Sequence, residues 1–216
     1  QIAAAVSCAA PGEQVLDYCA GGGGKTIAMA AMMQNKGQIF SHDIDGKRLS
    51  ALIPRMERAG IRNVQLRHPK ENASLDDLNL KMDLVMIDAP CTGVGTWRRK
   101  PDAKWRVQPN ALDKRMQDQA TILRTACNYV KPGGRLVYVT CSFLMEENEE
   151  QVASFLADRK DFKAEDAAEA AAKSGQLTEK GAALVRKCRL PNGSVRLTPR
   201  TAGTDGFYMA VMRRAG

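Results

Sequence analysis

Residues 14–26 of the chain read QVLDYCAGGGGKT. The segment opens with the apolar pair Val15 and Leu16, continues through four consecutive glycines at 21–24, and leads into helix-forming residues over 26–34. A short strand, a glycine-rich turn and a helix in this order are typical of a ligand-binding α/β sheet. Glycine lets a ligand approach the backbone, and a helix N-terminus offers free N–H groups. We predict a ligand-binding turn here; the alternative is a tight connection that binds nothing.

The turn fits neither of the two common phosphate-binding patterns. A P-loop reads G-x-x-x-x-G-K-[ST], and with Lys25 and Thr26 in place its first glycine falls at residue 19, which is a cysteine. The dinucleotide pattern G-x-G-x-x-G fits only loosely, through the run of glycines. The turn alone therefore does not identify the ligand.

The sequence outward from this turn alternates predicted strands with predicted helices. Strands are expected at 14–18, 38–42, 63–66, 83–87 and 134–140, and helices at 26–34, 46–59, 111–130 and 147–157. This order predicts an α/β fold with a largely parallel sheet and helices on both faces. Two more strands, at 194–197 and 207–212, are predicted to pair antiparallel, and the polar segment 158–188 has no predicted place. We expect residues 1–216 to form a single domain.

Composition excludes several classes of protein. Of the 216 residues, 44% are hydrophobic and 26% are charged, which excludes a disordered chain. The sequence has no apolar stretch of about 18 residues and no basic secretory signal, so we expect a cytoplasmic protein without a membrane-spanning helix. Six cysteines without a C-x-x-C pair, and only two histidines, predict no metal site.

The positive charge is concentrated in two blocks. The net charge is +8, and residues 98–135 hold 10 Lys and Arg against 3 Asp and Glu. Residues 173–216 hold 9 against 2, whereas residues 136–172 between them hold 3 against 9. A basic balance of this kind favours an acidic partner, most commonly nucleic acid. The alternative is that these residues only solvate two helix faces.

An acidic residue lies at the end of the second predicted strand. Asp43, in the sequence His42-Asp43-Ile44-Asp45, comes 26 residues after Asp17. A carboxylate at this place in a nucleoside-binding sheet accepts hydrogen bonds from ribose hydroxyls. Together with the glycine turn, Asp43 indicates a nucleoside cofactor. An alternative role for Asp45 is to cap the next helix.

Two cysteines follow predicted strands directly. Cys91 belongs to DAPCTGVG at 88–95, and Cys141 to VTCS at 139–142. Because the carboxyl ends of parallel strands meet at one edge of the sheet, we expect both thiols in one crevice. A thiolate stabilised by positive charge or a helix N-terminus is a nucleophile; the alternative is a small buried hydrophobic residue. We treat three other cysteines as structural: Cys8, Cys127 and Cys188.

A basic tract with two tryptophans follows Cys91. Residues 97–106 read WRRKPDAKWR, a mixture suited to phosphate contacts and base stacking. We expect RNA to contact Arg98, Arg99, Lys100, Lys104 and Trp105. The alternative is a solvated loop with tryptophan packed against it.

Taken together, these residues resemble the Sun/Fmu-type family of RNA cytosine-5 methyltransferases. The similarity spans roughly residues 10–155, with the segment 204–210 (TDGFYMA) near the end. It rests on D-x-C-A-x-x-G-G-K-T, on D-A-P-C-x-G-x-G with R-R-x-P-D-x-x-W, and on P-G-G-x-L-V-Y-x-T-C-S with E-E-N. The resemblance implies a Rossmann-like class I methyltransferase fold with an antiparallel C-terminal strand.

The resemblance also implies a set of site residues and partners. S-adenosylmethionine would be held by Cys19, Ala20, Gly21, Gly22, Gly23, Gly24, Lys25, Asp43 and Asp88. Cys141 would be the nucleophile, and Cys91 would help to release the product. The partner would be ribosomal or transfer RNA at a single-stranded or opened site, because the target base must leave any stack.

Three departures from the family pattern affect these expectations. The family loop usually reads C-A-A-P-G-G-K, but Gly21 and Gly22 stand where Ala and Pro are usual, so we expect a more flexible loop and weaker cofactor binding. An acid commonly follows the third strand, where this chain has His68-Pro69. The chain also starts at Gln1 rather than Met, and we expect an N-terminal RNA-binding segment of a longer protein to be missing.

The implied reaction needs a nucleophile because carbon-5 of cytosine is unreactive. Addition of a thiolate to carbon-6 makes carbon-5 able to attack the sulfonium methyl group. A protonated acid at ring nitrogen 3 would stabilise the displaced electrons, and Asp88 is a candidate. Lys25, if near, would stabilise the Cys141 thiolate or a phosphate. A base must then remove the carbon-5 proton so that the thiolate can leave, with help from Cys91.

Several other functions share part of this pattern. A non-catalytic RNA- or nucleoside-binding module would keep the fold without the chemistry. A nucleoside-dependent oxidoreductase shares the sheet, the glycine turn and the acid at strand two, but does not need paired cysteines. A methylase of exocyclic amines would carry Asp/Asn-Pro-Pro-Tyr where this chain has Asp88-Ala89-Pro90-Cys91. The two cysteine roles can also be reversed, because DNA cytosine methylases use a Pro-Cys nucleophile.

Overall fold

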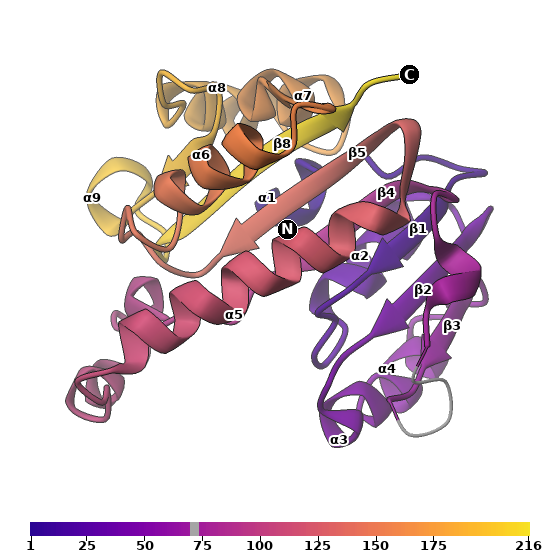
Figure 1. The fold of residues 1–216 in the computed structure, drawn as a ribbon, viewed down its shortest axis with the longest axis horizontal. Coiled ribbons are helices and arrows are strands. Elements are labelled where there is room, and N and C mark those ends of the chain that lie inside the picture. Colours follow the sequence, from indigo (N-terminus) through magenta and orange to yellow (C-terminus); the bar gives the residue numbers. More distant parts are fainter. Residues whose placement is uncertain (70–73) are drawn as a thin grey trace.

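One sheet organises the protein in the computed structural model, which describes residues 1–69 and 74–216. Its strand order is β3-β2-β1-β4-β5-β8-β6, with β7 also paired to β8 (Figure 1). The strands are β1 (Gln14–Asp17), β2 (Gln38–His42), β3 (Val64–Arg67), β4 (Met82–Asp88), β5 (Val130–Thr140), β6 (Phe162–Glu165), β7 (Val195–Leu197) and β8 (Phe207–Arg214).

The first five strands are parallel, and β8 is antiparallel to its three neighbours. The chain moves outward from β1 to β3, then returns to the other side of β1 with β4. The reversal of strand order between β1 and β4 opens a crevice at their carboxyl ends, which is where ligands bind in such sheets. The predicted α/β class, the largely parallel sheet and the antiparallel C-terminal strand are confirmed.

Helices cover both faces of the sheet, as predicted. In Figure 1, α5 and α6 lie in front of the sheet and α2 behind it. Strand residues alternate between the two faces: Leu84 and Met86 of β4 belong to one hydrophobic cluster, and Val85 and Ile87 to the other. The helices are α1 (Ile2–Ala5), α2 (Gly24–Met32), α3 (Gly46–Ser50), α4 (Ile53–Arg58), α5 (Ala111–Ala126), α6 (Glu149–Asp158), α7 (Ala167–Lys173), α8 (Glu179–Lys187) and α9 (Pro199–Ala202).

Two parts of the chain differ from the predicted elements. The expected helix at 46–59 is broken into α3 and α4, because Pro54 in the first turn of α4 has no N–H to continue a helix from α3. The polar segment 158–188 contains β6, α7 and α8, and it is part of the core. Ala167, Ala168 and Ala171 of α7 are fully buried. The many polar residues around them gave no sequence sign of this burial.

The second basic block is largely neutralised inside the fold. Five arginines of 173–216 form ion pairs with acids of the segment 136–172: Arg186–Glu169, Arg189–Asp166, Arg196–Glu149, Arg213–Glu165 and Arg214–Asp161. The excess charge of this block therefore meets the acidic segment next to it in sequence.

In the described part of the chain, no helix combines the length and apolar character needed to span a membrane.

Candidate active site

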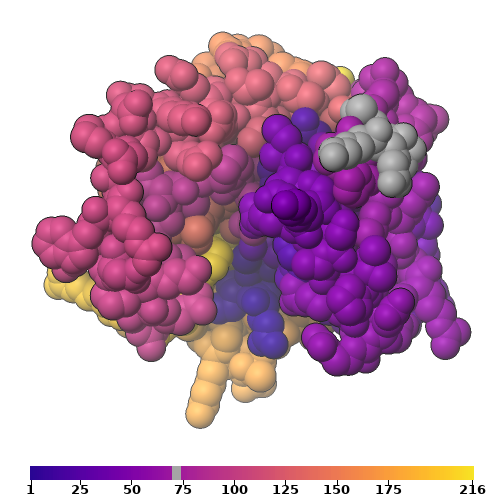
Figure 2. Space-filling model, turned by 90° about the horizontal axis from the view of Figure 1, so that it is seen from below, coloured from indigo at the N-terminus to yellow at the C-terminus, as the bar shows by residue number. Residues whose placement is uncertain are grey.

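The carboxyl ends of β1, β2, β4 and β5 surround a cavity of about 380 Å³. Figure 2 views this edge of the molecule and shows the hollow between the purple residues around α3 and the pink residues of α5. The cavity lining combines residues that follow four predicted strands with Arg48 and Ile122, whereas residues 20–25 of the glycine turn and the basic tract 97–106 are not part of it: the lining residues are Tyr18, Cys19, His42, Asp43, Ile44, Arg48, Asp88, Ala89, Pro90, Cys91, Ile122 and Cys141. Segments far apart in sequence therefore share one site.

Asp43 joins the glycine turn to the loop after β2. Its Oδ2 accepts the Gly21 N–H at 2.7 Å, and its Oδ1 accepts the Asp45 N–H at 2.8 Å. Gly21 has a φ of +53°, a left-handed conformation that glycine adopts without strain. Asp45 caps α3 by accepting the Lys47 and Arg48 N–H groups, which is the alternative role considered above. Asp43 thus fixes the backbone on both sides of the cavity entrance.

Asp17 lies beneath the turn and was not predicted as a site residue. It is fully buried, and its Oδ2 accepts the Thr26 hydroxyl at 2.6 Å, whereas Oδ1 has no hydrogen-bond partner among the described residues. Burial raises the pKa of Asp17 to about 7. Its place before a glycine turn, in the D-x-C-A motif, is the sequence signal that could have singled it out.

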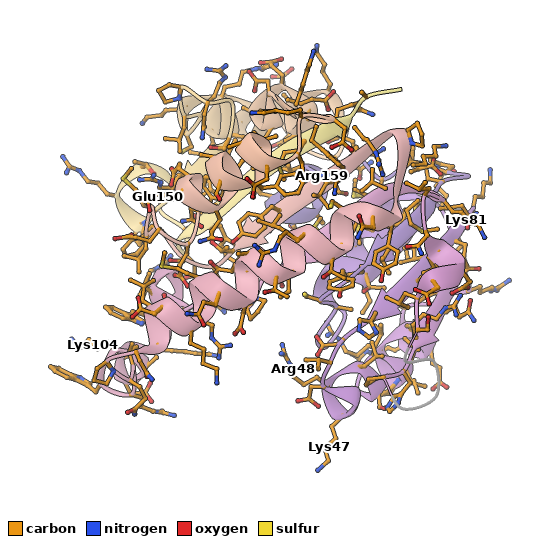
Figure 3. All side chains as sticks on the ribbon, in the orientation of Figure 1. Lys47, Arg48, Lys81, Lys104, Glu150 and Arg159 are labelled. Carbon is orange, nitrogen blue, oxygen red and sulfur yellow. The ribbon has the colours of Figure 1, made fainter. Side chains whose placement is uncertain are left out.

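Two arginines that were not predicted as site residues, Arg48 and Arg55, pack on the glycine turn. A Cβ on Gly21 would lie 2.7 Å from the Arg48 guanidinium, and a Cβ on Gly22 would lie 3.3 Å from that of Arg55. Arg55 also donates to the Gly22 carbonyl oxygen. Figure 3 shows Arg48 on the side of α3 that faces α5. The two glycines that depart from the family loop are therefore the ones contacted by arginine side chains.

His68 lies beside the start of α3. A Cβ on Gly46 would come within 2.4 Å of His68 Nε2, so the imidazole packs directly against the helix N-terminus. This is the position after β3 where the family commonly has an acid. The imidazole lies against the loop that carries Asp43 and Asp45.

The thiols of Cys91 and Cys141 meet at the cavity. Their Sγ atoms are 3.3 Å apart, although the residues are separated by 50 positions. The hydrogen bond that Cys141 accepts from Cys91 holds the pKa of the Cys141 thiol below its ordinary value, and the charge of Lys25 acts in the same direction. The same hydrogen bond, burial and the nearby Glu147 raise the pKa of Cys91. Of the pair, Cys141 therefore loses its proton more readily than Cys91.

Lys25 and Asp88 form an ion pair at the same edge. Lys25 Nζ lies 2.6 Å from Asp88 Oδ2. Lys25 belongs to the first turn of α2, and Asp88 is the last residue of β4. Cys19 lines the cavity beside them, and burial raises its pKa, so it lies here as a thiol. The geometry brings Lys25, Asp88, Cys91 and Cys141 into one cluster.

Two consecutive residues behind the cysteines were not predicted as site residues. Glu147 and Asn148 are both fully buried, immediately before α6. Glu147 accepts hydrogen bonds from the loop that follows Cys91, and Asn148 is bonded to residues on both sides of Cys141. The E-E-N motif was visible in the sequence, but nothing in its pattern indicated which loops it would contact.

The basic tract divides into held and exposed residues. Arg98 donates to the Gly203 carbonyl oxygen at 2.9 Å and Arg99 pairs with Asp205, so both tie the tract to the loop before β8. Lys104 lies 4.7 Å from the ring centroid of Trp105, which is 81% exposed. Figure 3 shows Lys104 at the tip of the projection formed by this tract and the start of α5.

A groove of about 370 Å³ lies along this projection and reaches Cys91. Cys91 and Thr92 line it together with the cations Lys100, Arg106 and Arg115. Only Lys100 was among the predicted RNA-contacting residues. Arg106 and Arg115 were missed because one lies at the edge of the tract and the other on α5, where residue spacing gave no sign that they face Cys91.

The sequence matches a known family over most of its length. The family described as "16S rRNA methyltransferase RsmB/F" matches residues 6–213. The chain is 33% identical over 205 residues to the "Probable ribosomal RNA small subunit methyltransferase B" of Bacillus subtilis. That similarity covers 94% of this chain but 44% of the relative, so the chain spans less than half the length of that protein.

The fold matches solved structures of the same kind. The crystal structure of PH0851 superposes with a TM-score of 0.81 at 32% identity, covering 99% of this chain and 45% of that chain. NSun6 from Pyrococcus horikoshii, crystallised with SFG, superposes with a TM-score of 0.79 at 27% identity and covers 100% of this chain and 51% of its own.

These similarities decide several of the predictions made above. The family resemblance and the Rossmann-like methyltransferase fold are confirmed, and with them S-adenosylmethionine as the cofactor of this family. The family match extends from the residues before β1 into β8, so it includes every motif that lines the cavity. The chain belongs to the RsmB/F family of 16S rRNA methyltransferases.

Proposed function

We propose that this chain transfers a methyl group from S-adenosylmethionine to carbon-5 of a cytosine in RNA, through a covalent adduct with Cys141. The observation that carries the proposal is the 3.3 Å separation of the Cys91 and Cys141 sulfur atoms beside a cavity that Asp43 and Asp88 also line. Two thiols at the mouth of a nucleoside-binding crevice suit a reaction that forms and then breaks a carbon–sulfur bond.

The cavity has the size and the polar groups that the cofactor needs. Its volume of about 380 Å³ falls within the range of about 300–1,000 Å³ that is usual for small-ligand sites. Each Asp43 oxygen accepts one backbone N–H and can accept a second hydrogen bond, which leaves room for ribose hydroxyls. Apart from the backbone of α2 and the adjacent residues, no heavy atom of the described residues lies within 4 Å of a Cβ built on Gly24, so the first turn of α2 has space for a ligand.

We assign the remaining cofactor contacts to the turn and to Asp88. The turn residues are Cys19, Ala20, Gly21, Gly22, Gly23, Gly24 and Lys25. Arg48, which lines the same cavity and forms no ion pair among the described residues, adds a positive charge beside them. When bound, S-adenosylmethionine supplies an electrophilic methyl group on its sulfonium.

Cys141 is the group we assign as nucleophile. Its thiolate forms a bond to carbon-6 of the cytosine, and the displaced electrons of the carbon-5–carbon-6 double bond make carbon-5 nucleophilic toward the methyl group. Asp88 and its partner Lys25 are the charged groups that we assign to the ring nitrogen 3 side of the base, where the Lys25 ammonium would stabilise the displaced electrons. Lys25 lies close enough to the cluster to favour the thiolate before the reaction.

Cys91 is the group we assign to product release. After methyl transfer, carbon-5 carries both a proton and the new methyl group. Loss of that proton to water restores the double bond between carbon-5 and carbon-6 and expels the Cys141 thiolate. Cys91 Sγ lies 3.3 Å from Cys141 Sγ, close enough for its S–H to donate to the departing sulfur, and the raised pKa of Cys91 favours the protonated thiol.

RNA is the proposed acceptor. The groove lined by Lys100, Arg106 and Arg115 reaches Cys91, so a strand whose phosphates follow these cations would present one base to the cysteines. Trp105 and Lys104, exposed at the tip, extend the contact by stacking and charge. Arg98 and Arg99 contribute by holding the tract in place and by their remaining exposed charge.

The test is to incubate the chain with total RNA and S-adenosylmethionine labelled in the methyl group, and to map the labelled nucleotide. Methylcytosine is expected; label on another nucleotide would reject the proposal. Cys141→Ala should abolish both the label and covalent protein–RNA complexes. Cys91→Ala should instead accumulate a covalent complex, visible as a slow band on a denaturing gel. The opposite pattern would reverse the two roles.

A non-catalytic RNA-binding module is the alternative. It predicts RNA binding with neither methyl transfer nor a covalent complex. Calorimetric titration with S-adenosylmethionine separates the two further, because a module without chemistry has no need to retain the Asp43 and Asp88 side chains at an open cavity.

A further inference from the structure

Glu147 and Asn148, at the start of α6, each contact the loop of a different cysteine. We propose that these two residues position the reacting thiols: Glu147 fixes Cys91 for release, and Asn148 fixes Cys141 for attack. The assignment of these two steps rests on the function proposed above. Neither side chain lines the cavity, so both act through the loops they hold.

Glu147 binds the backbone and side chain next to Cys91. Its Oε1 accepts the Thr92 N–H at 2.7 Å, and its Oε2 accepts the Thr92 hydroxyl at 2.6 Å. Gln119 of α5 donates to Glu147 Oε1 at 3.2 Å and, from the same nitrogen, to the Pro90 carbonyl oxygen at 3.0 Å. The residues on both sides of Cys91 are therefore attached to one carboxylate–amide pair.

Because Glu147 is buried, exchanging one of its carboxylate oxygens for a nitrogen should disrupt its hydrogen bonds. The residue is 0% exposed, and within residues 1–69 and 74–216 no Lys or Arg forms an ion pair with it. A buried carboxylate is stable only when donors surround it, and among the described residues the donors to Glu147 come from Thr92 and Gln119. Replacement by an amide turns one acceptor into a donor that faces another donor.

Asn148 makes the corresponding contacts around Cys141. The Thr140 hydroxyl donates to Asn148 Oδ1 at 2.5 Å, and Asn148 Nδ2 donates to the Ser142 carbonyl oxygen at 3.1 Å. Both neighbours of Cys141 are thus bonded to one side chain. Because Asn148 uses its oxygen as an acceptor and its nitrogen as a donor, aspartate can replace the first contact but not the second.

The two loops are also joined to each other. The Gly95 N–H donates to the Cys141 carbonyl oxygen at 3.0 Å, and a Cβ on Gly95 would lie 2.7 Å from that oxygen. The loops therefore fit together closely, with Glu147 and Asn148 supporting them from behind. Covalent steps depend strongly on such placement, because a misplacement of about 1 Å can cost about 100-fold in rate.

The distinguishing experiment compares Glu147→Gln with Asn148→Asp in the covalent-complex assay. Glu147→Gln should lower methyl turnover at least 10-fold while the covalent protein–RNA complex accumulates, as in Cys91→Ala. Asn148→Asp should lower turnover without accumulation, because attack itself is slowed.

Glu150→Gln is the matched control: Glu150 is exposed on α6, labelled in Figure 3, and its change should leave both readouts unaltered. Loss of accumulation in Glu147→Gln, with Cys91→Ala still accumulating, would overturn the Glu147 role, and accumulation in Asn148→Asp would overturn the Asn148 role.

A second readout needs no RNA and so separates the positioning role from the proposed reaction. Hydrogen peroxide oxidises the two thiols to a Cys91–Cys141 disulfide and is itself reduced to two water molecules. The rate, followed by mass spectrometry of the linked peptides, should fall at least 5-fold in both variants and stay unchanged in Glu150→Gln. Equal rates in all proteins would reject positioning. A fall in rate, with Cys91→Ala failing to accumulate a complex, would reject the proposed reaction instead.

Thr92→Val keeps the test valid if Glu147→Gln does not fold. It preserves the side-chain shape and the backbone N–H but removes the hydroxyl donor to Glu147. It should slow disulfide formation and release in the same direction, by a smaller factor than Glu147→Gln. Unchanged disulfide and release rates in Thr92→Val would count against the role of Glu147.

Discussion

Lys25 Nζ lies 2.6 Å from Asp88 Oδ2 and so links the first turn of α2 to the last residue of β4. The pair stands beside the two cysteines, and the Lys25 charge lowers the pKa of the Cys141 thiol. A lysine in the glycine turn therefore acts on a thiol that lies more than 100 residues later in the sequence. This relationship leads to a prediction that does not depend on knowing the substrate.

Lys25→Met should raise the pKa of the Cys141 thiol, because it removes a positive charge that favours the thiolate. At neutral pH the thiolate fraction then falls, and alkylation of Cys141 by iodoacetamide should shift to higher pH. Peptide mass spectrometry over a series of pH values measures the shift for Cys141 alone. Lys25→Arg keeps the charge and should keep the profile. An identical profile in Lys25→Met would show that the lysine does not act on this thiol.

Asp17→Asn should change how stability depends on pH. The pKa of Asp17 is raised to about 7 in the folded protein from an ordinary value of 3.8. Between these values the unfolded chain loses the Asp17 proton while the folded protein keeps it, so the free energy of unfolding falls as pH rises from about 4 to about 7. The slope from this group approaches about 1.4 kcal/mol per pH unit.

Denaturant unfolding at pH 5, 6, 7 and 8 measures the effect. Asparagine stays neutral at every pH and can still accept the Thr26 hydroxyl through its amide oxygen. The stability of Asp17→Asn relative to the natural protein should therefore increase with pH over this range and level off above it. A difference that stays constant from pH 5 to 8 would contradict the raised pKa.

The fold was predictable from the sequence wherever the residues of a single strand or helix showed a recognisable hydrophobic pattern. The glycine turn, Asp43 and the two cysteines all directly follow apolar strands, so their meeting at one sheet edge follows from parallel topology. The secondary structure of segment 158–188 was not predicted, because β6 is short and the buried residues of α7 are alanines, which give little periodic hydrophobic signal. Pro54, by contrast, was a visible sign that the helix over 46–59 would break.

The missed site residues share a physical cause. Arg48, Arg106 and Glu147 face the site only because separate elements pack together, and no local spacing encodes that contact. Pairing of the second basic block with the acidic segment was likewise invisible, because charge balance along a chain does not say which side chains meet. Motifs at strand ends can be recognised in the local sequence, whereas the residues that support them come together only in the tertiary structure.

Asp43→Ala should weaken S-adenosylmethionine binding about 10- to 100-fold. It removes the carboxylate that orients the Gly21 and Asp45 N–H groups and that we expect to accept ribose hydroxyls. Hydrogen bonds to a charged group contribute about 1.5–3 kcal/mol each, and the expected weakening corresponds to removal of one such bond. Titration calorimetry gives the affinity, and circular dichroism checks that the fold persists.

Asp45→Ala is the control for that change. Asp45 caps α3 by accepting two backbone N–H groups but does not line the cavity, so its loss should lower stability by about 1 kcal/mol with little change in affinity. Equal losses of cofactor affinity in the two variants would mean that Asp43 acts only by ordering the loop.

Lys100→Gln combined with Arg106→Gln should weaken RNA binding and reduce its dependence on salt. Both cations line the groove that reaches Cys91, and each phosphate that a cation neutralises releases a bound counterion. For single-stranded RNA the slope of log affinity against log salt should become less steep by about 0.7 for each phosphate that is no longer neutralised. Fluorescence anisotropy with a labelled RNA from about 50 to 200 mM salt measures both quantities.

The matched control places the same neutralisation on the other part of the molecule. Lys180→Gln combined with Lys187→Gln also removes two exposed charges, both from α8, which Figure 1 shows away from the projection around Pro101–Trp105. If the groove guides the strand, this control leaves the slope unaltered while the double variant flattens it. If binding instead depends on total charge alone, each removed cation has the same effect wherever it lies, and the groove loses its proposed role.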